Sequence, residues 1–257
     1  MSFFAVLLAL VIEQLKPLPR NNWIHAALEA WVDWTGRNFD AGKSHHAWIV
    51  WAVSVLTPGL CFSLLFIVIH HYSLILALVF DVAVLYLTLG FRQFSHYFTD
   101  IRDALERGDE IEARRLLAEW RHLDASELPR TELLRHVLEH ALLAAHRHVF
   151  GVFFWFVLLS TLGLGPLGAV IYRMAEFASR WWTYPSKTLG MPANPRLMAV
   201  SQRMFSWIDH VPARLTAFGF AVVGNFEEAI NSWRRDATLW QHDNEGVILA
   251  AAAGAVG

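Results

Sequence analysis

The sequence has a single cysteine, few charged side chains and no excess of positive charge. Cys61 alone cannot form a disulfide within the chain, so no disulfide framework stabilises the fold. Its position in an apolar run predicts a small, buried side chain. The formal net charge is −2, and this charge balance gives no indication of a nucleic-acid-binding protein.

General nucleotide-binding and hydrolytic motifs are also missing. The chain contains no Gly-x-x-x-x-Gly-Lys-Ser/Thr loop, no Gly-x-Ser-x-Gly elbow and no paired Cys-x-x-Cys. An ATP-using or hydrolytic activity therefore cannot be assigned from a general motif.

Apolar residues are abundant and concentrated in blocks. They make up 55% of the chain, and charged residues only 17%, whereas soluble domains have about 45–50% and about 25%. The run 48–69 carries no charge and meets the length of roughly 20 residues that a spanning helix needs. We therefore expect an all-α fold, a polytopic transmembrane helix bundle that forms a single membrane domain over 1–257. The expected spanning runs are 1–15, 48–69, 74–91, 150–172 and 212–229, with the start of another at 246–257.

Residues 92–148 form a polar stretch between the third and fourth runs. Its apolar residues recur at helical spacing, and Gly108-Asp109 reads as a turn between two helices. We interpret it as a helical extramembrane insert. Most lysines and arginines fall on its side of the expected topology, which predicts that the insert is cytoplasmic.

Two sets of polar residues are candidates for a site. Asp81 interrupts an apolar run, and a carboxylate at mid-bilayer costs about 2.5–3.5 kcal/mol. It either forms a polar site between helices, or bonds to a neighbouring helix or lies near the interface. His136 and His140 have the i, i+4 spacing of metal ligands, but no third ligand shares their face, so we predict no metal site.

Three segments resemble one family. Gly165–Arg173 is a Gly/Pro-rich helix that ends in Tyr-Arg, Val211–Ala217 reads Val-Pro-Ala-Arg-Leu-Thr-Ala, and Ala104–Arg114 contains Ala-Leu-x-x-Gly-Asp. In this order they are similar to motifs of the CobD/CbiB superfamily of bacterial inner-membrane proteins. The resemblance implies a multi-pass protein of the bacterial inner membrane.

Enzymes of that family are taken to be adenosylcobinamide-phosphate synthases, which join an aminopropanol or its phosphate to a corrinoid carboxylate as an amide. The polar positions expected for that chemistry are largely changed here. The family's Glu-Ser-x-x-Glu-Asn-x-x-Asp-Gly falls on Glu139-His140, Leu143-Ala144 and Arg147-His148, which keep only the first Glu. Its Asn-Thr-Leu-Asp falls on Glu176–Ser179, which lacks both Asn and Asp.

Other segments resemble a sister branch, the AmpE-like proteins associated with regulation of β-lactamase expression. They are Phe153–Leu159, Trp207–Arg214 and Phe218–Phe226. The preferred hypothesis is therefore a regulatory, sensing or interaction role with a degraded synthase site. The alternative is a synthase-type enzyme of cobalamin biosynthesis, which would use ATP and Mg²⁺.

The expected partners are the lipid bilayer and a cytoplasmic protein that binds residues 92–148; oligomers are possible, and nucleic acid is not expected. Arg173 and Arg214 could neutralise phosphate, or could anchor helix ends at the interface. The candidate catalytic residues are Glu139 and Asp209, and the candidate ligand-binding residues are Asp81, Tyr172, Arg173, Arg214 and Asn225.

Overall fold

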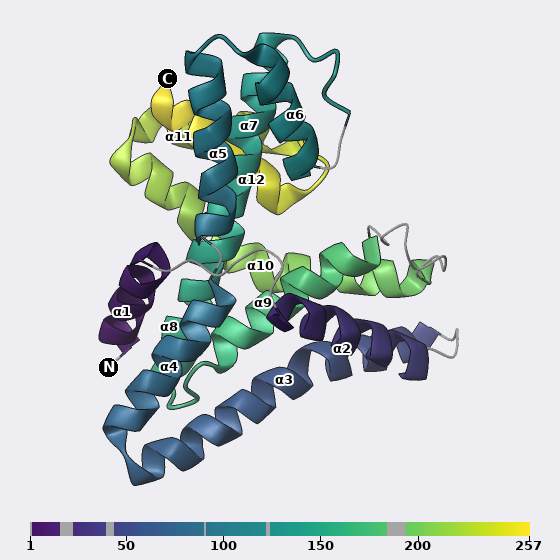
Figure 1. Cartoon of the computed structure of the whole chain (residues 1–257), viewed down its shortest axis with the longest axis vertical. Coiled ribbons are helices and arrows are strands. Elements are labelled where there is room, and N and C mark those ends of the chain that lie inside the picture. Colours follow the sequence, from purple (N-terminus) through teal and green to yellow (C-terminus); the bar gives the residue numbers. More distant parts are fainter. Residues whose placement is uncertain (1, 16–22, 40–43, 90, 122–123, 184–193) are drawn as a thin grey trace. The chain divides into compact units, whose positions relative to one another are not determined.

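A computed structural model describes residues 2–15, 23–39, 44–89, 91–121, 124–183 and 194–257. Helices make up almost all of these residues and no strand occurs among them, which confirms the expected all-α class (Figure 1). The elements are α1 (Ser2–Leu15), α2 (Trp23–Phe39), α3 (Ser44–Tyr72), α4 (Leu74–Thr88), α5 (Phe91–Glu106), α6 (Glu110–Arg121), α7 (Arg130–Ala145), the π-helix η1 (His146–Phe150), α8 (Gly151–Thr161), α9 (Leu167–Thr183), α10 (Pro195–Val223), α11 (Phe226–Asp236), the 3₁₀-helix η2 (Ala237–Leu239) and α12 (Asp243–Val256).

The chain divides into two compact units. Unit 1 comprises Met1–Leu89 and Phe150–Pro212, and unit 2 comprises Gly90–Val149 and Ala213–Gly257. The insert is thus packed with the C-terminal helices, because α12 contacts both α11 and α7. Small residues allow this packing: a Cβ added at Gly254 would overlap the backbone of α11.

In unit 1, α9 packs against α3 and α8, and α1 packs against α4. The closest approach is at Gly168, where an added Cβ would overlap the carbonyl oxygen of Trp155 in α8. Ala5 and Ala9 of α1 are fully buried in one cluster with side chains of α4 and α8. Glycine and alanine at such positions let helix backbones touch.

The apolar run 150–172 was expected to form one spanning helix. The structure divides it between two helices, α8 and α9. Gly163 has φ +78°, its N–H donates to the carbonyl of Ser160, and the N–H of Leu164 donates to the carbonyl of Leu159. This pair of bonds is a Schellman motif, which ends a helix where glycine adopts the left-handed conformation. The chain then turns at Gly165, and α9 begins at Leu167.

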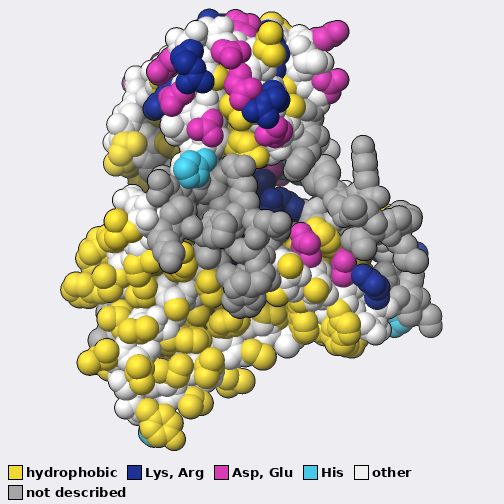
Figure 2. All heavy atoms as spheres, in the orientation of Figure 1, with side chains coloured by type: hydrophobic (Ala, Val, Ile, Leu, Met, Phe, Trp, Pro, Cys, Tyr) yellow, Lys and Arg dark blue, Asp and Glu magenta, His cyan; other side chains and the backbone are white. Residues whose placement is uncertain are grey.

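Two helical segments are long and apolar enough to cross a membrane, His46–Tyr72 and Arg130–Thr161, and α1 and α4 are shorter apolar helices. In each long segment only 28% of the most apolar window is buried within the chain, whereas the core helix of a soluble protein is mostly buried. Apolar side chains cover the visible surface of α3 and α4 (Figure 2). Cys61 lies on such a surface and is exposed, so its predicted burial was wrong.

In unit 2, the insert has a core of its own between α5, α6 and α7, built on side chains such as Ile101, Leu117 and Leu133. Gly108, at φ +78°, makes the turn between α5 and α6, as the Gly108-Asp109 pair predicted. Ion pairs line its surface, for example Arg115 with Glu112 and Glu119. Charged side chains are correspondingly dense over α5 and α6 in Figure 2.

Candidate functional site

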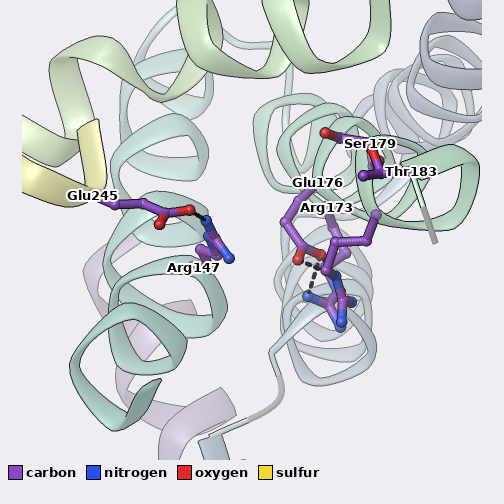
Figure 3. A network of polar contacts seen from close by, with 7 residues as sticks. Arg147, Arg173, Glu176, Ser179, Thr183 and Glu245 are labelled. Atoms are coloured by element: carbon purple, nitrogen blue, oxygen red, sulfur yellow. Dashed lines mark hydrogen bonds and ion pairs between the residues drawn. The ribbon is translucent and has the colours of Figure 1, made fainter. Parts of the chain in front are cut away.

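A buried ion cluster lies on one face of α9 in unit 1 (Figure 3). Glu176 is 1% exposed and accepts from Arg173 Nη1 at 3.0 Å and from Arg180 Nε at 2.5 Å. A second Arg180 nitrogen, Nη2, lies 3.2 Å from Glu176 Oε2. The three side chains are neighbours because residues three and four apart share a helix face.

Two guanidinium groups contact one carboxylate in this cluster. The Arg173 side chain is 13% exposed and that of Arg180 is 46% exposed, so solvent reaches the cluster from the Arg180 side. Arginine forks suit bidentate binding of phosphate or carboxylate. Glu176 fixes both arginines, whose guanidinium groups are of the type that binds anions.

A second buried contact joins α9 to α10. The hydroxyl of Tyr172 donates to Asp209 Oδ1 at 2.7 Å, and both side chains are buried. The Tyr172 ring packs on Phe205 and against the backbone of Gly151, where an added Cβ would overlap the ring. Packing thus fixes the ring, and the ring in turn orients the Asp209 carboxylate.

Asp81 is buried in α4 and lies in the same unit. It is 5% exposed, and its Oδ1 has no hydrogen-bond partner among the described residues. Phe80 stacks on Phe62 of α3, and Ser63 of α3 donates to the carbonyl of Leu164 just before α9. Asp81 thus belongs to a helix, α4, that packs against both α3 and α9.

In unit 2 the Val-Pro-Ala-Arg-Leu-Thr-Ala segment supplies two polar side chains to α10. Arg214 Nη1 donates to Asn244 Oδ1 at 3.1 Å, and Thr216 Oγ1 lies 2.9 Å from Nδ1 of the buried His146. His146 belongs to the π-helix, a distortion that redirects side chains and is frequent at functional sites.

Arg147, also of the π-helix, pairs with Glu245 of α12 (Figure 3). Arg147 stands where the synthase-type pattern has an aspartate. At this position the chain therefore has an arginine, which is engaged in an ion pair within unit 2.

Two predicted site residues have ordinary structural partners. Glu139 pairs with Arg135 at 3.0 Å on the surface of α7, and Asn225 caps α11 by accepting from the N–H of Glu228. The histidine pair does not converge, because His136 contacts Arg121 and His140 packs edge-on against Trp120. The described residues contain no group of three potential metal ligands.

The structure thus brings Tyr172 and Asp209 together and places Arg173 one position further along α9. Of the other predicted site residues, Asp81 lies on α4 of unit 1, whereas Glu139, Arg214 and Asn225 belong to unit 2. Sequence reasoning missed Glu176 and Arg180 as members of the ion cluster. Their i, i+3, i+7 spacing from Arg173 in an otherwise apolar helix was a signal for them.

Taken together, the structure is that of a helical bundle with an apolar surface of the membrane type and polar side chains buried between its helices. A comparison with protein families identifies the family: the chain belongs to the CobD/CbiB protein family, which it matches over residues 3–257.

Two curated relatives are both described as cobalamin biosynthesis protein CobD. The one from Stutzerimonas stutzeri is 29% identical over 99% of this chain and 80% of its own length. The one from Chromobacterium violaceum is 31% identical over 71% of this chain, and the match covers 55% of that relative. No solved structure shows significant similarity.

Proposed function

We propose that this chain is a multi-pass membrane protein of cobalamin biosynthesis that acts as an adenosylcobinamide-phosphate synthase-type, amide-forming enzyme. The observation that carries the proposal is the buried polar site of α9 and α10 in a chain that matches the family along its whole length. The names of both curated relatives support the pathway.

Two polar features of unit 1 would carry the chemistry, namely the Tyr172–Asp209 contact and the ion cluster of α9. Amide formation requires a base for the incoming amine, and the Asp209 carboxylate, held by the Tyr172 hydroxyl, suits that role. The Arg173–Glu176–Arg180 cluster would hold a phosphate of the aminopropanol phosphate or of ATP. ATP supplies the activation of the corrinoid carboxylate. Mg²⁺ would be held largely by the substrate phosphates.

The second candidate is the regulatory, sensing or interaction role of the AmpE-like branch. Leu143, Ala144 and Arg147 favour it, because they replace the Glu, Asn and Asp of the synthase-type pattern. The internal pairing of Arg147 with Glu245 favours it as well. In this role the buried polar groups would hold the bundle together, and the insert would bind a cytoplasmic protein.

In both cases we propose that the chain resides in the bacterial inner membrane with the insert in the cytoplasm. The apolar segments His46–Tyr72 and Arg130–Thr161 support a membrane location. The excess of arginine in and around the insert supports the orientation.

The test is turnover by the purified full-length chain in detergent with adenosylcobyric acid, aminopropanol phosphate, ATP and Mg²⁺. We expect Asp209→Asn to lower kcat by about 10²–10⁴-fold, the usual contribution of a general base. Asp103→Asn is the matched control, because Asp103 is an exposed partner of Arg102 in the insert. Absence of turnover beside an active synthase would refute the enzymatic proposal and favour the regulatory one.

A further inference from the structure

Asp81 lies on the buried face of α4, in the middle of the helix. Residues three and four positions apart share one face of a helix. Ala77, four residues before Asp81, is buried, and so are Val84 and Leu85, three and four residues after it. Val79, on the opposite side of α4, is exposed. The Asp81 side chain is therefore directed into unit 1 and away from the apolar outer surface.

The buried face of α4 meets α9, the helix that carries the proposed site. Leu85 belongs to one buried cluster with Tyr172, and Val84 belongs to another with Met174 of α9. The hydroxyl of Tyr172 holds the carboxylate of α10 on which the proposed chemistry depends. Asp81 thus adds an acidic group on the α4 side of the same unit.

The Asp81 carboxylate differs from two other buried carboxylates of unit 1. Glu176 receives donors from two arginines, and Asp209 receives the hydroxyl of Tyr172. Asp81 Oδ1 has no hydrogen-bond partner in the part of the chain that the structure describes, although the residue is only 5% exposed. A buried carboxylate is unfavourable unless it is paired or binds a cation. In an apolar helix of a membrane protein, such a residue marks a ligand or ion site.

The neighbours of Asp81 indicate which kind of cation it can bind. A metal ion requires several ligands, and the described residues offer no group of three histidine, cysteine or acidic side chains. The α4 face around Asp81 is otherwise apolar, through Ala77, Val84 and Leu85. A primary ammonium group on a short carbon chain suits this setting, because a single carboxylate can accept its charge-assisted hydrogen bond and the carbon chain can contact apolar side chains.

We propose that Asp81 binds the ammonium group of the small amine substrate, aminopropanol or its phosphate. The inference rests on the proposed function, in which this amine forms the amide. Asp81 Oδ1 accepts from the ammonium, while Arg173 and Arg180 hold the phosphate. In this role Asp81 determines specificity, because it distinguishes an amine from an alcohol of the same shape.

A pair of matched ligands tests the proposal with the purified full-length chain in detergent. Aminopropanol phosphate and propanediol phosphate share the phosphate and differ in the amine. The wild-type chain should bind the amine about 10–100-fold more tightly, the usual effect of a hydrogen bond to a charged group, as measured by thermophoresis. Asp81→Asn keeps the shape of the side chain and should abolish this preference, whereas the exposed control Asp103→Asn should retain it. Equal affinities in the wild-type chain, or a preference that persists in Asp81→Asn, would overturn the proposal.

The stability of the ligand-free chain separates ligand binding from a structural role. Asp81 Oδ1 has no partner to lose among the described residues, so Asp81→Asn should leave the thermal unfolding temperature unchanged or raise it. A lower temperature than that of Asp103→Asn would show that Asp81 bonds to a neighbouring helix, and would contradict the proposal.

Turnover measurements distinguish failure of this inference from failure of the proposed function. In an active enzyme, Asp81→Asn should raise KM for aminopropanol phosphate by about 10–100-fold and leave KM for ATP unchanged. An active Asp81→Asn variant with an unchanged KM for the amine would refute the inference alone. Absence of turnover, combined with an amine preference that only Asp81→Asn abolishes, would refute the enzymatic proposal alone.

Discussion

Replacing Glu176 by glutamine is the sharpest test of the buried ion cluster in α9. The substitution keeps the shape of the side chain but removes the charge that receives Arg173 and Arg180. Two guanidinium groups would then share one helix face, and the Arg173 side chain is only 13% exposed.

The expected loss follows from the burial of each partner. Breaking a buried ion pair by removing one member costs about 3–5 kcal/mol. Because the Arg180 side chain is 46% exposed, solvent screens part of the remaining charge. We therefore expect Glu176→Gln to lower the free energy of unfolding by about 3 kcal/mol.

Equilibrium unfolding in mixed micelles, followed by tryptophan fluorescence, measures this quantity. A double-mutant cycle with Arg180→Gln separates the pairwise interaction from other effects. A loss below about 0.5 kcal/mol, the range of ordinary surface substitutions, together with no coupling, would show that the cluster does not stabilise the fold.

Three further predictions concern single side chains. Tyr172→Phe removes the hydroxyl that donates to the α10 carboxylate, and should lower the free energy of unfolding by about 1–2 kcal/mol in the same assay. Gly168→Ala should lower the free energy of unfolding by about 1–3 kcal/mol, because its methyl group would overlap a carbonyl oxygen of α8. The control Gly36→Ala should leave the free energy of unfolding unchanged or raise it, because its Cβ would lie 3.8 Å from the nearest atom. In the insert, hydrogen bonds from the hydroxyl and N–H of Ser126 lower the pKa of Asp124. The ionised Asp124 therefore stabilises the folded state above the ordinary pKa of aspartate, and this stabilisation is lost as the pH falls through the pKa of the folded state. Ser126→Ala should raise that pKa in an NMR titration, and an unchanged value would contradict the role of the hydroxyl.

The sequence predicted the helices better than their contacts. Apolar runs and the Gly108 turn are local patterns, so α3, α4 and the α5–α6 hairpin could be located without a structure. The break at Gly163 depends on a glycine in the left-handed conformation, which the apolar pattern of the run does not specify. A local signal, the i, i+3, i+7 spacing, was available for Glu176 and Arg180.

Contacts between helices are a different matter. Tyr172 and Asp209 are distant in sequence, and so are His146 and Thr216. Each pair forms only because two helices pack in one register, which no single-chain pattern encodes. The division into two compact units likewise depends on packing, that of α12 against α11 and α7.

The measurement that tests the central claim most directly is formation of the corrinoid amide by the purified chain. With adenosylcobyric acid, aminopropanol phosphate, ATP and Mg²⁺, mass spectrometry should detect the amide product. Its rate should fall by about 10²–10⁴-fold in Asp209→Asn and remain unchanged in Asp103→Asn. No product from a folded chain, beside a synthase that is active in the same mixture, would contradict the account.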